Sequence, residues 1–196
     1  MESRNQRSMK TRKLVLLALL TAMVAVLAYL GGFIKIGGLA SISLTLIPVV
    51  VGAILYGPYA GAWLGGVAGA MFFATPDAAF WLGLSIPGTI ITVMVKGVLS
   101  GLCAGLAYKL LARLNRYVAV VVSAIVCPVV NTGIFLLGMV CFFSDVIAEK
   151  WAGGANIFLF LVGLIWINFI IEVGINIVLS PAIVRIVDAV KKKSKK

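Results

Sequence analysis

The chain has 196 residues, of which 62% are hydrophobic and only 12% are charged, and its mean hydropathy is +1.15. Soluble domains carry about 25% charged residues, so this composition excludes a soluble globular domain. The net charge of +11 would indicate a nucleic-acid partner in a soluble protein, but here its distribution indicates membrane topology. The absence of histidine excludes His-based metal sites, Ser-His-Asp catalysis and Cys-His catalysis within this chain.

Six apolar segments are long enough, or nearly long enough, to cross a bilayer, which takes about 20 helical residues. The sequence therefore predicts an all-α integral membrane protein built as a bundle of six transmembrane helices. The second and third segments are short, and Pro48 interrupts the second, a pattern that often accompanies a binding site. The segments are residues 14–33, 43–56, 58–74, 87–111, 118–143 and 157–187.

The distribution of basic residues predicts the orientation of this bundle. Cytoplasmic segments of membrane proteins carry an excess of lysine and arginine. Six crossings from a cytoplasmic N-terminus leave only Lys35 and Lys150 as basic residues on the outer side. We therefore expect a basic cytoplasmic N-terminus over 1–13, a membrane domain over 14–187 and a basic cytoplasmic tail over 188–196.

The three outer connections of this arrangement span 34–43, 75–86 and 144–156. Each could act as a lid over a cavity or be an ordinary solvated loop. The second connection carries Asp77 and Trp81, and Trp81 is a candidate substrate-binding residue.

Small residues recur at spacing four along the predicted helices. They occur in the third segment at Gly57, Gly61, Gly65 and Gly69, in the fourth at Gly97, Gly101 and Gly105, and in the first at Ala18 and Ala22. Small residues allow close approach of helix backbones in lipid. The glycines predict packing within the bundle, and those of the third segment also predict contact with an external partner.

Lys96 and Glu172 are the charges that this arrangement places deep in the membrane. A buried charge is costly in lipid, so such residues usually face a cavity and mark a functional site. Asn168, Glu172 and Asn176 are spaced i, i+4, i+8 and therefore share one stripe of a helix. These residues predict a polar cavity inside the bundle, to which Asn131 and Thr92 also contribute.

The roles of these polar residues have alternatives. Lys96 and Glu172 could form a structural ion pair, or Lys96 could bind the carboxylate or phosphate of a ligand, or Glu172 could relay protons. Asn131 follows Pro128, which removes a helix hydrogen bond. Asn131 therefore either satisfies a freed backbone group or meets a ligand.

The sequence contains no GxxxxGK[ST] phosphate-binding loop, so we expect no ATP hydrolysis and no other catalysis by this chain. A pocket without an energy source implies partner subunits or self-association. The leading hypothesis is a solute-binding membrane subunit, and the alternative is a small oligomeric proton-coupled transporter or channel that uses Glu172.

Over about residues 10–190, the chain resembles the substrate-binding S components of energy-coupling factor (ECF) transporters, in particular their riboflavin-transporter-like branch. The resemblance rests on the six-segment layout, on Ala18 and Ala22, and on four stretches. These are LTLIPVVVGAILYGPYAGAWLGGVAG, KGVLSGLCAGLAYKLL, CPVVNTGIFLLG and INIVLSPAIVRIV.

The resemblance implies a substrate-binding subunit of a vitamin importer in the bacterial plasma membrane, without a cofactor. Its substrate would be riboflavin, pantothenate or a similar micronutrient. It would dock on a membrane T subunit, itself carried by two cytoplasmic ATPases, through Ala18 and Ala22, with Gly61 and Gly65 as further candidates. The segment after the first span would form part of a lid, and the whole subunit would topple in the membrane during transport.

Overall fold

The computed structural model of the chain describes residues 2–33, 43–147 and 157–194. All regular secondary structure in these residues is helical, which confirms the predicted all-α class. The helices are α1 (Glu2–Gly31), α2 (Leu46–Tyr56), α3 (Pro58–Phe72), α4 (Pro76–Leu84), α5 (Ile86–Leu111), α6 (Arg116–Ile147) and α7 (Ile157–Ser194).

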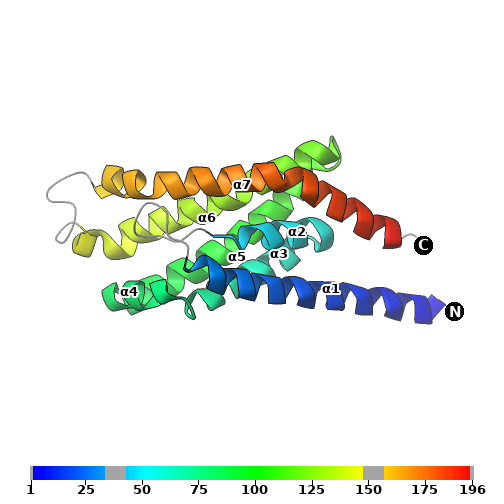
Figure 1. The fold of residues 1–196 in the computed structure, drawn as a ribbon, viewed down its shortest axis with the longest axis horizontal. Helices are drawn as coiled ribbons and strands as arrows, with labels where there is room; N and C mark the ends of the chain where they lie inside the picture. The colour runs from blue at the N-terminus through cyan, green and yellow to red at the C-terminus, as the bar shows by residue number, and fades with distance from the viewer. Residues whose placement is uncertain (1, 34–42, 148–156, 195–196) are drawn as a thin grey trace.

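The long helices α1, α5, α6 and α7 run side by side along the bundle (Figure 1). Both chain termini lie at one end of the bundle, and α4 lies at the other (Figure 1). These four helices each contain a stretch long and apolar enough to cross a membrane, and α3 with α4 could supply a fifth crossing. The chain is therefore a multi-pass membrane protein, whereas the count of six spans stays a prediction.

A helix, α4, occupies most of the segment that the sequence analysis treated as the second outer connection. It follows α3 after a short break, and the two helices are bent by 82° relative to each other. Pro76 starts α4, where its missing N–H costs no helix hydrogen bond. The hydroxyl of Thr89 then donates to the carbonyl oxygen of Trp81 at 2.7 Å, which ties α4 to α5. Of the two alternatives, a lid or a solvated loop, the solvated loop is wrong, because this short segment is apolar enough to form a helix that packs on its neighbours.

The short helix α2 lies in the middle of the bundle and contacts α1, α3, α5, α6 and α7. Its central residues, Val49, Val50 and Ala53, are almost completely buried and form part of the main hydrophobic core. With 11 residues, α2 is only about 16 Å long. Space for polar groups therefore remains at its N-terminal end. At its other end Gly57 has a φ of +95°, a left-handed conformation that favours glycine and allows the chain to turn into α3.

Helices α3 and α5 approach each other through their glycines. A Cβ atom added to Gly65 would overlap the carbonyl oxygen of Gly97, and one added to Gly61 would overlap that of Gly101. The predicted packing of the two glycine faces within the bundle is therefore confirmed. Gly61 and Gly65 are themselves buried, so in this structure they lie against α5 and away from the outer surface where a partner would bind.

Candidate functional site

A polar cavity lies at the end of the bundle that carries α4. Its polar lining comes from four helices, and it includes Asp77 and Trp81 of α4, Lys96 of α5, Asn131 of α6, and Asn168 and Glu172 of α7. Five of these six residues are predicted site residues, and the structure brings them together around one cavity. We refer to this space below as the polar cavity.

Lys96 lies between the polar cavity and a second cavity on the side of α1. The second cavity is also lined by Asn131 and by Ala28, Gly32 and Thr45. Among the described residues that line this second cavity, Lys96 is the only charged one. The following residue, Gly97, packs on Gly65 of α3, so the backbone that carries Lys96 is held in a tight helix contact. A ligand in either cavity would therefore meet the same ammonium group.

The ammonium group of Lys96 lies near two aromatic rings and shares the polar cavity with two acidic side chains. Its Nζ atom lies 4.7 Å from the ring centroid of Phe135 and 5.8 Å from that of Phe72. A cation over such ring faces gains about 0.5–2 kcal/mol. Glu172 and Asp77 line the same cavity as Lys96. The ring contacts offset part of the cost of placing a charge inside the bundle.

Glu172 links α7 to the residues that precede α2. One of its carboxylate oxygens, Oε1, accepts a hydrogen bond from the backbone N–H of Ser43 at 2.8 Å. Hydrogen bonds to a charged group are stronger than those between neutral groups. The bond thus holds the chain before α2 against α7 at the edge of the polar cavity, and it gives Glu172 a partner in addition to the charge of Lys96.

Two of the predicted polar residues, Asn176 and Thr92, are not among the described residues that line the polar cavity. Asn176 donates from Nδ2 to the backbone carbonyl of Glu172 at 2.8 Å, so it bonds to its own helix. Thr92 lies in a narrow space beside Trp81 and Phe135, behind the polar cavity. Its side chain packs where a Cβ atom on Gly138 would otherwise stand. Among the described residues Thr92 therefore does not line the polar cavity, and Gly138 of α6 packs against its side chain. Its role in substrate binding stays a prediction.

The comparison with known families gives a match over most of the chain. The family described as "ECF transporter, substrate-specific component" matches residues 12–184, from α1 through most of α7. The chain belongs to this family. S components are membrane subunits that bind substrate and are not themselves enzymes, and membership of this family implies partnership with a membrane T subunit and ATPase subunits. A comparison with curated proteins finds no match.

Among the lining residues of the polar cavity that the sequence did not single out are Asp77, Phe72 and Phe135. Asp77 was visible as an acidic residue beside Trp81, but its segment was expected to be an outer connection, either a lid or a solvated loop. The two phenylalanines carry no signal in a chain rich in apolar residues. Only their distance from Lys96 distinguishes them from phenylalanines that face lipid or the core.

Replacing Glu172 should test the link to Ser43 in this S component. In Glu172→Ala the N–H of Ser43 loses its acceptor, and a buried donor without a partner costs about 1–3 kcal/mol. Glu172→Gln removes the same charge but keeps an acceptor oxygen. We expect faster hydrogen–deuterium exchange at the Ser43 amide in Glu172→Ala than in Glu172→Gln. Equal exchange in the two variants would show that the hydrogen bond does not hold this segment.

Proposed function

We propose that this S component captures a small polar micronutrient, such as riboflavin or pantothenate, in the polar cavity and delivers it across the bacterial plasma membrane. The observation that supports this most strongly is the convergence of Lys96, Asn131, Asn168 and Glu172 on one cavity inside an apolar bundle. Ionisable groups inside a membrane protein usually mark a substrate pathway. Asn131 and Asn168 would fix the orientation of the ligand by hydrogen bonds.

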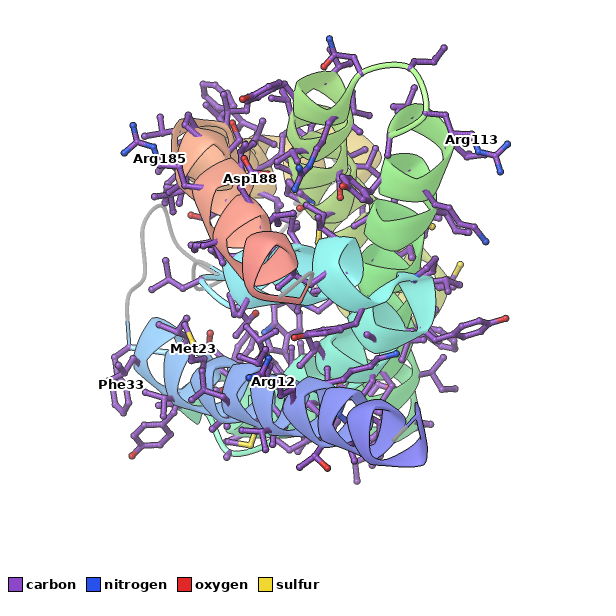
Figure 2. All side chains as sticks on the ribbon, turned by 90° about the vertical axis from the view of Figure 1, so that its right-hand side faces the viewer. Arg12, Met23, Phe33, Arg113, Arg185 and Asp188 are labelled. Atoms are coloured by element: carbon purple, nitrogen blue, oxygen red, sulfur yellow. The ribbon has the colours of Figure 1, made fainter. Side chains whose placement is uncertain are left out.

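The distribution of charge supports an orientation in which the cavity opens outward. Figure 2 views the bundle from the end that carries both termini, and Arg113 and Arg185 point away from the bundle there. At the same end Arg116 of α6 pairs with Asp188 of α7. Since basic residues favour the cytoplasmic side, we place this end in the cytoplasm. The polar cavity, at the end with α4, then lies in the outer half of the membrane.

The outer face of α1 supplies the docking surface for the T subunit in this proposal. Among the described residues α1 packs mainly on α2 and α3, so the rest of its surface is open. Ala18 and Ala22 are exposed there, next to Leu19 and Val26. Small residues flanked by large apolar ones allow a partner helix to approach closely in lipid. Two cytoplasmic ATPases carried by the T subunit would then supply the energy.

The deciding experiment is the identification of the molecule that the protein holds. The chain is purified in detergent and denatured, and any released small molecule is identified by mass spectrometry. A vitamin present in stoichiometric amount would support the proposal and name the substrate. An empty protein that also shows no thermal shift with a panel of vitamins would contradict it.

Loss of the polar side chains should weaken binding without unfolding the protein. Lys96→Ala removes the ammonium group that both cavities share, and Asn168→Ala removes an amide from the wall formed by α7. A hydrogen bond to a charged group contributes about 1.5–3 kcal/mol, so Lys96→Ala should lower the affinity for the identified vitamin by about 10-fold to 100-fold. Isothermal titration with the purified variants measures this. Normal binding by both variants would show that the site lies elsewhere.

A further inference from the structure

An apolar groove runs between α6 and α7 directly behind the polar cavity. It is lined by Thr132, Gly133 and Leu136 of α6 and by Ile165, Trp166 and Phe169 of α7. Trp166 is half exposed. No heavy atom lies within 4 Å of the position that a Cβ atom on Gly133 would occupy. The groove is therefore open to the lipid side, and the glycine leaves it deep.

The groove and the polar cavity share part of their walls. Thr132, Ile165 and Phe169 line both spaces, so one layer of side chains separates them. Phe169 and Ile165 have the groove on one side and the polar cavity on the other. A rotation of these side chains out of the shared wall would join the two spaces into one, with polar groups at the inner end and apolar walls at the outer end.

The volumes of the two spaces indicate what would fill the joined site. The polar cavity encloses about 70 Å³ and the second cavity beside Lys96 about 60 Å³, whereas the groove encloses about 200 Å³. Sites for small molecules usually measure about 300–1,000 Å³. Most of the space on the two sides of Thr132, Ile165 and Phe169 thus belongs to the apolar groove, and a purely polar ligand in the polar cavity would leave that groove unused.

We infer that the ligand of this protein is an amphiphile, with a polar head in the polar cavity and an apolar arm that lies between α6 and α7. This inference rests on the proposed function and adds a ligand class to it. The head meets Lys96, Asn131 and Glu172. The arm passes Thr132 and Phe169 and lies along Gly133, Leu136 and Trp166. A lipid acyl chain that enters the groove from the bilayer is the competing occupant, and it would not depend on the polar cavity.

The test uses two series of probes, n-alkyl carboxylates and n-alkylammonium ions, each from butyl to decyl. Binding to the protein in lipid nanodiscs is measured by equilibrium dialysis, with empty nanodiscs as the blank for partition into the bilayer. For at least one series we expect affinity to rise with chain length, by up to about fourfold for each buried methylene group. Failure of both series to bind would overturn the inference.

Gly133→Trp places a bulky side chain at the groove, at a position where a Cβ atom meets no neighbouring helix or side chain within 4 Å. The gain with chain length should disappear in this variant. The matched control is Leu137→Trp, one residue from Leu136 on the same helix, because Leu137 is 65% exposed and lies outside the groove. This control should keep the gain. An unchanged gain in Gly133→Trp would overturn the inference.

Changes at the polar end separate a ligand arm from a lipid chain. Lys96→Ala should weaken carboxylate probes, and Glu172→Gln should weaken ammonium probes, by the same factor at every chain length. If neither change has an effect while Gly133→Trp removes the gain, the groove holds a lipid chain and the inference fails. That failure would leave the proposed function standing if the identified vitamin still depends on Lys96 and Asn168.

Discussion

The variant Gly65→Leu is expected to yield no stably folded protein. The position of a Cβ atom on Gly65 overlaps the carbonyl oxygen of Gly97, which belongs to the backbone of α5 and cannot rotate away. Adding even one methyl group would force α3 and α5 apart, and overpacking of this kind costs about 1–3 kcal/mol or more. A leucine adds three further carbon atoms to the same contact. Fluorescence-detected size exclusion and thermal unfolding in detergent measure the loss.

The pair Gly65→Ala and Gly133→Ala isolates the steric cause of this effect. Both replace a helical glycine by alanine, which by propensity alone stabilises a helix by about 1 kcal/mol. Gly133 has open space around its Cβ position, whereas Gly65 does not. We expect Gly65→Ala to lower the melting temperature and Gly133→Ala to leave it unchanged or raise it. Equal melting temperatures would mean that α3 and α5 are not in this close contact.

The variant Ala22→Trp is expected to abolish substrate uptake in cells that also contain the T and ATPase subunits. Ala22 is exposed on α1, so the indole group points away from the bundle and should not disturb the fold. On the proposed docking surface it would hold the partner helix several ångströms away, and close packing is what drives helix association in lipid. Uptake of radiolabelled vitamin should fall to background, while the purified variant binds the vitamin with unchanged affinity. Ala18→Trp should behave in the same way.

Val178→Trp is the control for this prediction, because Val178 is 76% exposed on α7 and lies outside the proposed docking surface. It should retain uptake. Loss of ligand binding in Ala22→Trp would instead indicate that α1 shapes the binding cavity. Normal uptake in both Ala18→Trp and Ala22→Trp would show that the T subunit docks on another surface.

The sequence predicts the helical class and most of the polar site because membrane burial makes their signals strong. Lys96 and Glu172 are unusual for their depth, and the structure does bring them to one cavity with Asn131 and Asn168. The spacing of Gly61 and Gly65 predicts a close helix contact. It could not predict with certainty that the contact would be internal, because α3 carries small residues on more than one side.

The bend between α3 and α4 is one physical reason why the sequence did not predict the whole cavity wall. Short apolar stretches that end in proline are compatible with either a loop or a short helix. Once α4 turns back on α5, Asp77 and Trp81 become buried residues of the cavity wall. Thr92 was assigned by its distance along α5 from Lys96, but the side of a helix that faces α6 is not fixed by distance. In the structure the side chain of Thr92 packs against Gly138 of α6.

The contact between α3 and α5 limits how this protein can change shape. Two backbones that meet without intervening side chains have no alternative rotamers through which to slide, so this pair forms a rigid frame. Lys96 is fixed to that frame, whereas Asn168 and Glu172 belong to α7, which meets the frame mainly through α6 and α2. On the proposed function, substitutions on α6 and α7 would therefore change the binding cavity while this frame stays intact. An engineer who wishes to change the cargo should vary those two helices and leave the glycines of α3 and α5 untouched.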